Sequence, residues 1–159
     1  MDADEIQQTL RKCEFFGELS DEELKPIADL GVLEEYASGD IIYKQGNAGA
    51  KLYVLSKGQV SLVRTLKLDN NRMANATVYV LRESLGRRLM GGWCTLVGKK
   101  HVQMCTARCD KPSKVVSIDS SELREIMIRN ADVQVKLLEK LVLILRGRIE
   151  SSFAAMETL

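Results

Sequence analysis

The chain has 159 residues, enough for one domain with a sizeable core and too few for two ordinary ones. Its 23 basic and 22 acidic side chains nearly cancel, so no overall field favours nucleic acid or an anionic membrane as a partner. The longest apolar run, 141–145, is far too short to span a membrane, and the acidic first residues lack the pattern of a secretion signal. We therefore expect a cytoplasmic globular protein that does not bind nucleic acid directly.

Two short helices are predicted in the first thirty residues. Ile6, Leu10 and Cys13 recur at helical spacing, which predicts an amphipathic helix over 3–13. Ser20 is followed three residues later by Glu23, the pattern of a capping box in which each side chain binds the backbone amide of the other residue. This box predicts that a second helix starts there and runs to about residue 30.

From residue 32 the apolar pattern changes from helical to alternating. Turn signals divide this region into eight expected strands, at 32–37, 41–44, 51–56, 59–66, 76–82, 87–90, 101–109 and 114–118. Lys57-Gly58 marks a hairpin turn, and the polar segment 68–74 is expected to be the tip of a longer hairpin. Many short strands with frequent turns predict an antiparallel sandwich or barrel.

The last forty residues return to helical spacing. Ser120, Ser121 and Glu122 are expected to start a helix that ends near residue 128. Asn130 breaks that helix and caps a second one, from about 132 to near the end. We accordingly divide the chain into a β domain with flanking helices, 1–130, and a dimerisation helix, 131–159.

The final helix carries two apolar stripes. A heptad seam consists of Val135, Leu138, Val142, Leu145 and Ile149, and its spacing continues through Ser152 and Met156. A second stripe consists of Leu137, Leu141 and Ile144. β-branched residues at a and leucine at d favour a two-stranded parallel coiled coil. Since a helix that is apolar nearly all round needs two partners, we expect its own β domain on one side and a second copy on the other; the alternative is a helix packed within one chain.

The stretch 91–109 opens with the glycine pair Gly91-Gly92 and the short apolar segment 93–97. Adjacent glycines let the backbone approach a ligand closely and leave the first amides of a short helix free, an arrangement that cradles an anion. A phosphate site normally adds a cation nearby. The positions where such a cation is expected are uncharged in this chain.

The segment 38–63, SGDIIYKQGNAGAKLYVLSKGQVSLV, and the entry segment FFGELSDEEL resemble the cyclic nucleotide-binding domain family. VVSID followed by SSELREIM resembles its last strand and following helix, and the resemblance covers about 15–150. It implies a mainly β fold, an eight-stranded antiparallel jelly roll with N-terminal helices and two C-terminal helices. It also implies a cyclic nucleotide site between the roll and the 91–109 cassette, which signals to the terminal helix.

This chain departs from the family pattern at the cassette. In the family, a glutamate after the glycine holds the ribose hydroxyl, and a later arginine pairs with the cyclic phosphate. Gly91 matches the glycine, but Gly92 falls on the glutamate and Gln103 on the arginine. Losing the arginine costs about 2–5 kcal/mol and losing the ribose acceptor about 1–2 kcal/mol. We therefore expect weak or absent binding of cAMP and cGMP, and no other cofactor.

By this resemblance the ligand-binding residues are Gly91, Gly92, Trp93, Cys94, Thr95, Gln103, Met104 and Thr106. Lys99 and Lys100 are candidate substitutes for the arginine, although a solvated loop is the favoured interpretation. Arg108 has the opposite strand parity to Gln103 and should face away. Trp93 could stack on a purine or fill the space of the nucleotide, and we favour filling. The single histidine, His101, is expected at the surface of a strand edge.

We expect a non-catalytic regulatory module that acts as a homodimer, with an effector protein as a further candidate partner. No Ser/His/Asp or Cys/His constellation suggests catalysis. One alternative is a working sensor of a cyclic nucleotide or another small ligand. Another is a redox or metal sensor that uses Cys94, Cys105 and Cys109, although no metal site is expected because the paired CxxC spacing of zinc sites is missing.

Overall fold

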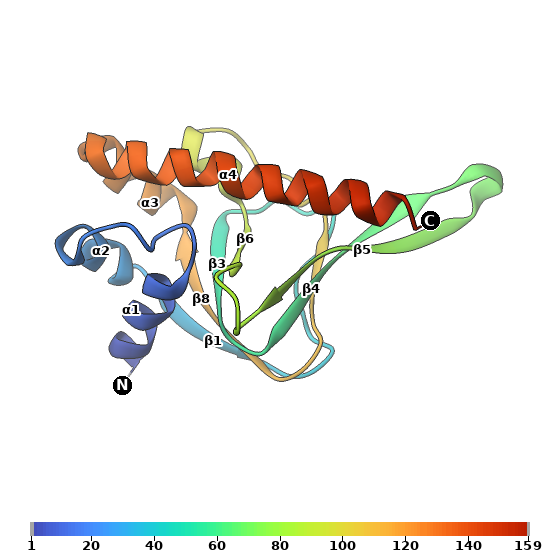
Figure 1. Ribbon diagram of the computed structural model, residues 1–159, viewed down its shortest axis with the longest axis horizontal. Helices are drawn as coiled ribbons and strands as arrows, with labels where there is room; N and C mark the ends of the chain where they lie inside the picture. The colour runs from blue at the N-terminus through green and yellow to red at the C-terminus, as the bar shows by residue number, and fades with distance from the viewer. Residues whose placement is uncertain (1, 159) are drawn as a thin grey trace.

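The computed structural model describes residues 2–158, which form a β roll flanked by helices (Figure 1). The helices are α1 (Asp2–Lys12), α2 (Asp21–Ala28), α3 (Ser120–Arg129) and α4 (Ala131–Met156), with short 3-10 turns η1 (Asp69–Asn71) and η2 (Trp93–Val97). The strands are β1 (Val32–Tyr36), β2 (Ile41–Tyr43), β3 (Lys51–Lys57), β4 (Gln59–Lys67), β5 (Met73–Arg82), β6 (Leu89–Gly91), β7 (Thr106–Cys109) and β8 (Ser113–Asp119). The predicted fold class, an antiparallel jelly roll with helices at both ends, is confirmed.

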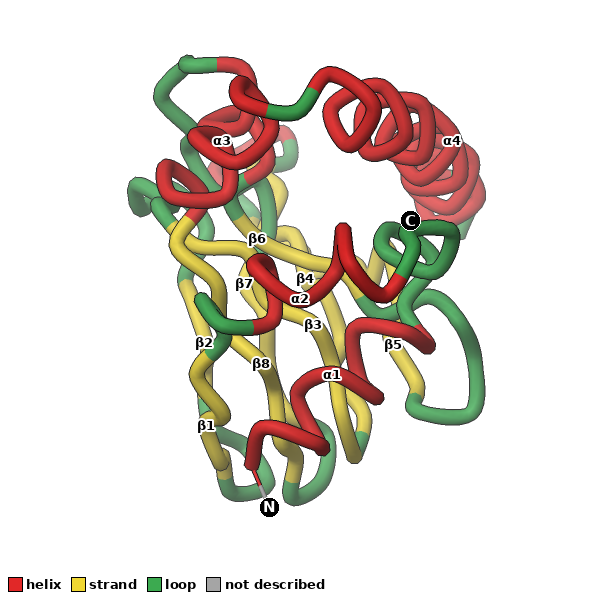
Figure 2. Tube along the Cα trace, turned by 90° about the vertical axis from the view of Figure 1, so that its left-hand side faces the viewer, coloured by secondary structure: helices red, strands yellow, loops and turns green. Residues whose placement is uncertain are grey.

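Two four-stranded antiparallel sheets form the roll, in the orders β1-β8-β3-β6 and β2-β7-β4-β5. The alternation of β3 shows how the two cores arise. Leu52 and Val54 pack against the helices, whereas Leu55 points between the sheets, because successive strand side chains lie on opposite faces. Figure 2 shows α1 and α2 against the outer side of the roll, with α3 and α4 across one end.

Local signals placed most helix ends correctly. The Ser20 hydroxyl accepts a hydrogen bond from the Glu23 amide at 3.1 Å, and the Glu23 carboxylate accepts one from the Ser20 amide at 2.9 Å, so the capping box is confirmed. The Asn130 side chain caps α4 by accepting from the Val133 amide. α3 starts at Ser120 as predicted, and the carboxylate of Asp119 caps it by accepting from the Glu122 amide.

The expected strand 101–109 is wrong in its first half. Regular pairing is confined to β7, which starts at Thr106, and residues 101–103 instead fold against the loop 46–49. The Gly49 amide donates to the His101 carbonyl at 2.9 Å, and the Gln103 amide donates to the Asn47 carbonyl at 2.8 Å. This irregular pairing with a distant loop overrides the local alternation.

The hairpin of β4 and β5 is longer than predicted. β4 continues to Lys67 and β5 begins at Met73, so the tip is confined to 68–72. Within it, Asn70 and Asn71 of η1 adopt left-handed backbone conformations that asparagine tolerates. Figure 1 shows this hairpin projecting beyond the roll, near the end of α4.

α4 is a 26-residue helix that lies across the roll. The stripe Leu137, Leu141 and Ile144 is buried in the core shared with the other helices. The expected packing of α4 against its own domain is therefore confirmed. Lys136 and Lys140 form ion pairs with Glu23 and Glu18, each at 2.8 Å. Within residues 2–158, none of the helices has the length and apolar character needed to cross a bilayer.

Candidate functional site

A cavity of about 590 Å³ lies between the sheet containing β4 and β5 and the distal half of α4. Tyr43, Leu62 and Val78 line it from the sheet. Leu145, Ile149 and Phe153 line it from α4. Its charged lining residues are Arg64 and Arg148. The cavity therefore presents a mostly apolar surface with two guanidinium groups.

The two glycines of the cassette are required by close backbone approach. Gly91 has a φ of +114°, and a Cβ there would lie 2.5 Å from the Lys51 carbonyl oxygen. A Cβ on Gly92 would lie 2.6 Å from the carbonyl oxygen of Gly49. The place that the family gives to a glutamate side chain is thus occupied by backbone in this chain.

The backbone amides around η2 are already engaged. The Gly92 amide donates to the Lys51 carbonyl at 2.8 Å. The Cys94 amide donates to Nδ1 of His101 at 3.5 Å. The expectation that the first amides of this short helix are free to cradle an anion is therefore wrong at both positions, because the chain itself provides acceptors.

His101 is buried, with 3% of its surface exposed, so its expected surface position is wrong. Its ring packs edge-to-face against Trp93, with the centroids 4.9 Å apart. Nε2 has no hydrogen-bond partner within residues 2–158. Burial lowers the pKa of His101, which the Gln103 side chain partly offsets, and the imidazole is held neutral. The fold of 101–103 onto the loop 46–49 explains this burial.

Trp93 and Gln103 both line the cavity. Gln103 is 4% exposed, and its side chain lies directly against Gly49, where a Cβ would be 2.2 Å from its Nε2. Trp93 forms part of the wall of the cavity of about 590 Å³. That its ring takes the space of a nucleotide stays a prediction.

The other predicted ligand residues are divided between the cavity and its surroundings. Met104 lines the cavity and is exposed. Thr106 accepts a hydrogen bond from the Gln45 amide at 3.0 Å. Cys94 is engaged through its amide, as described above, and Thr95 lines a different depression. The structure thus brings Trp93, Gln103 and Met104 to one space.

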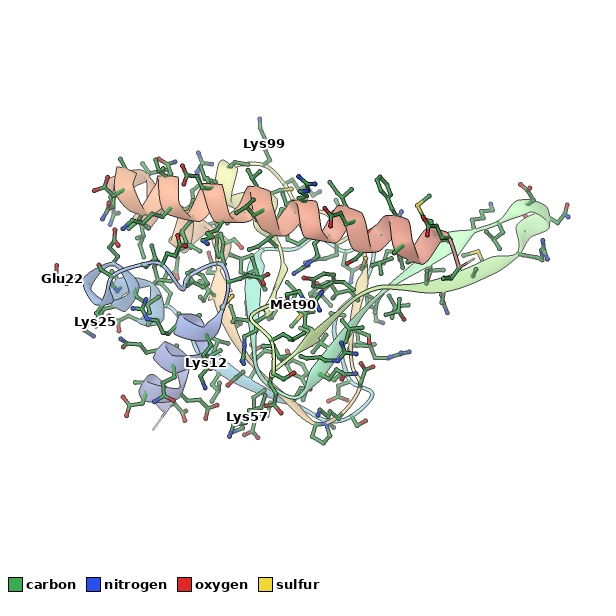
Figure 3. All side chains as sticks on the ribbon, viewed as in Figure 1. Lys12, Glu22, Lys25, Lys57, Met90 and Lys99 are labelled. Atoms are coloured by element: carbon green, nitrogen blue, oxygen red, sulfur yellow. The ribbon has the colours of Figure 1, made fainter. Side chains whose placement is uncertain are left out.

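Lys99 and Lys100 border a second, shallow depression together with Thr95 and Arg124. They do not line the cavity under α4. Figure 3 shows the Lys99 side chain directed away from the roll. Their positions agree with a solvated loop and give no support to either lysine as a replacement for the family arginine.

Arg148 is a site residue that sequence reasoning missed. It reaches from α4 to the carbonyl of Leu89, to which it donates a hydrogen bond, and its Cζ lies 4.0 Å from the centroid of the Tyr79 ring. Its Nε is buried without a partner among the described residues. Continuing the buried stripe four residues beyond Ile144 leads to Arg148, and this spacing was a signal for an inward-facing arginine.

Three of the four cysteines, Cys13, Cys105 and Cys109, lack the features of reactive thiols. Burial raises the pKa of Cys105 and Cys109, and it raises the pKa of Cys13 to about 12, so these thiols stay protonated. In the part of the chain that the structure describes, no group of three or more His, Cys, Asp or Glu residues could hold a metal ion.

The fold and the cavity define a small-ligand-binding β roll. The profile of the cyclic nucleotide-binding domain family matches residues 33–130, more than half of the chain. This chain therefore belongs to the cyclic nucleotide-binding domain family. The family model describes a ligand-binding domain.

Solved structures agree with this fold. A cyclic nucleotide-binding domain from Methylobacillus flagellatus matches with a TM-score of 0.74 at 16% identity, over 99% of this chain and 84% of that one. A putative cyclic nucleotide-binding protein from Geobacter metallireducens matches with a TM-score of 0.69 at 24% identity, over 90% and 97%. The sensor domain of the transcriptional regulator DNR from Pseudomonas aeruginosa matches with a TM-score of 0.68 at 21% identity, over 93% of each chain. No curated protein sequence matches the chain.

Proposed function

We propose that this chain is a non-catalytic regulatory module that binds cAMP and cGMP weakly or not at all and acts as a dimer through α4. The observation that carries the proposal is the absence from the cassette of the two side chains with which the family holds a cyclic nucleotide. Gln103 stands where the family has its phosphate-binding arginine, and backbone of Gly49 fills the space beside Gly92 where the family has its glutamate. Both polar contacts to a cyclic nucleotide are therefore missing.

The size of the loss supports weak binding. An unpaired phosphate costs about 2–5 kcal/mol, and each 1.4 kcal/mol is about a tenfold change in affinity. The engaged amides of Gly92 and Cys94 remove further donors that an anion would need. A micromolar site altered in this way becomes millimolar or weaker.

The outer surface of α4 supports the dimer. The a positions of the heptad seam, Val135, Val142 and Ile149, are all more than half exposed, whereas the d positions Leu138 and Leu145 pack partly against the core. The exposed a positions, together with the exposed side chains of Phe153 and Met156, form an apolar row that we call the outer ridge. A heptad-spaced row of this kind is self-complementary about a two-fold axis and fits a second copy of α4.

Ligand and partner share part of the helix. Ile149, Phe153 and Met156 belong to the outer ridge and also line the cavity. A ligand that contacts these side chains from inside changes the surface that the second copy or an effector protein would meet. This shared position is the physical basis that we propose for signalling through α4.

Isothermal titration of the purified chain with cAMP and with cGMP tests the proposal. We expect dissociation constants of millimolar or weaker for both nucleotides. Stoichiometric binding of either one below a micromolar dissociation constant would overturn it, because such affinity requires a phosphate-holding group that the cassette lacks.

A further inference from the structure

We propose that the cavity beneath α4 binds an organic carboxylate with a bulky apolar body, and that Arg148 holds its carboxylate. This inference rests on the proposed function, because it assigns a class of ligand to the site through which the module would be regulated. The carboxylate would be held by the helix and not by the cassette.

The cavity walls determine the body of the ligand. Leu62, Val78 and Ala76 on the sheet face Leu145 and Ile149 on the helix across the same space. Its volume of about 590 Å³ lies within the range of about 300–1,000 Å³ typical of small-molecule sites. Apolar walls favour hydrocarbon, whereas the sugar and base of a nucleotide would leave polar atoms unpaired against them.

Arg148 determines the charge of the ligand. Its guanidinium has five N–H donors, and the hydrogen bond that the structure shows for it is the one to the Leu89 carbonyl. The Tyr79 ring covers one face, and Nε is buried without a partner within residues 2–158. The group therefore lines an apolar cavity while retaining unused donors.

A cation in such surroundings is stabilised by an anion. Across residues 2–158, no carboxylate lies within ion-pairing distance of Arg148. Glu14 interacts with the charge of Arg148 at longer range. Burial raises the pKa of the Glu14 carboxyl, whereas the charges of Arg148 and Arg87 lower it. A ligand carboxylate would supply the direct, two-pronged contact that Glu14 does not make.

Arg64, the second charged lining residue, has another role. Its guanidinium donates to the Met104 carbonyl at 2.5 Å, and the residue is exposed. It thus fixes the segment after the cassette at the rim and remains in contact with water. Arg148 is half-buried and its Nε is shielded from water, which makes it the stronger anion partner, because charge interactions strengthen as water is excluded.

The chain contains its own reporter for a binding experiment. Trp93 is the single tryptophan and lines the cavity, so its emission responds to an occupant. The probes are decanoate and 4-cyclohexylbutyrate as carboxylates with apolar bodies, 1-decanol as an uncharged match and butyrate as a short anion. Each is titrated below its aggregation limit, with calorimetry as the second readout.

Two substitutions separate charge from volume. Arg148→Met removes the charge and keeps an apolar side chain, and Arg146→Met is its control because Arg146 is exposed and pairs with Glu150 on the same helix. Ala76→Phe adds bulk inside the cavity. Circular dichroism melting confirms that each variant is folded before its binding is measured.

We expect saturable binding of at least one of the two apolar carboxylates to the wild-type chain and to Arg146→Met. Arg148→Met should weaken that binding about 10- to 100-fold and leave 1-decanol unchanged. Ala76→Phe should weaken both, and butyrate should not bind measurably.

Three results would overturn the inference: no saturable binding of either apolar carboxylate, equal carboxylate binding by wild type and Arg148→Met, or carboxylate binding that Ala76→Phe leaves intact. A cAMP titration on the same sample keeps the two proposals apart. Weak cAMP binding without carboxylate binding overturns this inference alone, whereas tight cAMP binding overturns the proposed function.

Discussion

The cassette and the distal part of α4 face the same cavity but differ in what they offer a ligand. The cassette contributes Trp93, Gln103 and Met104, all uncharged. Its glycines lie against backbone, Gly91 against Lys51 and Gly92 against Gly49. The helix contributes apolar side chains and the guanidinium of Arg148. Of the two guanidinium groups that line the cavity, the less exposed one, that of Arg148, thus lies on the element that also carries the outer ridge, whereas Arg64 is exposed on β4.

This difference has a consequence for signalling. A charge on the roll would anchor a ligand to a rigid sheet and reach the helix only through secondary contacts. Under the proposed function, a charge on α4 would let a ligand act on the helix directly, so that occupancy and helix position would be coupled with few intermediates. The comparison predicts that changes on the outer ridge of α4 alter assembly, whereas changes in the cassette alter stability.

The largest effect is expected on the outer ridge. Val142→Asp places a carboxylate in the proposed seam, where an unpaired buried charge costs about 3–5 kcal/mol. Light scattering after size exclusion should show twice the chain's mass for the wild type and a monomer for the variant. The control is Leu143→Asp, because Leu143 is 63% exposed and Val142 67%, but Leu143 lies outside the heptad seam. Equal masses for both variants and the wild type would contradict the proposed dimer.

In the cassette, Gly92→Glu is expected to lower the free energy of unfolding by about 1–3 kcal/mol, because its Cβ meets the Gly49 carbonyl. Urea titration measures the loss. Gly86→Glu is the matched control, since the nearest atom to its Cβ is 3.8 Å away.

The double variant Gly92→Glu, Gln103→Arg restores the two residues of the family pattern. It should not produce tight cAMP binding. A stable double variant with micromolar affinity would show that the cassette can open.

A smaller, pH-dependent effect is expected from His101. Burial lowers the pKa of His101 from 6.5 in the folded chain. As the pH falls, the imidazole is therefore protonated more readily in the unfolded chain than in the folded chain. Stability should be fully present above about pH 6.5 and should fall as the pH decreases toward the folded-state pKa, with a slope of at most about 1.4 kcal/mol per pH unit. His101→Asn keeps an acceptor near the Cys94 amide. It should make the denaturation midpoint less dependent on pH between pH 7.5 and 5.5. An unchanged slope would mean that other groups dominate this range.

The smallest effect is expected at Gly147, inside α4. A Cβ there meets no atom within 4 Å, so Gly147→Ala should stabilise the helix by up to about 1 kcal/mol without disturbing the cavity. Thermal melting should show a rise of about 2–4 °C. The variant should keep the wild-type response to carboxylates, and a lower melting temperature would indicate that α4 bends at this residue.

Local patterns were sufficient for much of the fold. The capping residues Ser20 and Asn130, the eight alternating strands and the buried stripe of α4 could each be inferred from a few neighbouring residues. These features depend on hydrogen bonds and periodicity within one element, so sequence spacing contains the information. The family also followed from the order of these elements and their glycines.

The candidate site depended on contacts that the sequence does not display. The loop 46–49 determines the irregular course of 101–103, the burial of His101 and the closed space beside Gly92. Arg148 reaches the cavity only because α4 folds back over β4 and β5, far from the cassette in the chain. The sequence by itself determined the elements and their family, because those follow from local chemistry. The tertiary structure decided where the site's charge lies, because that position results from packing between distant segments.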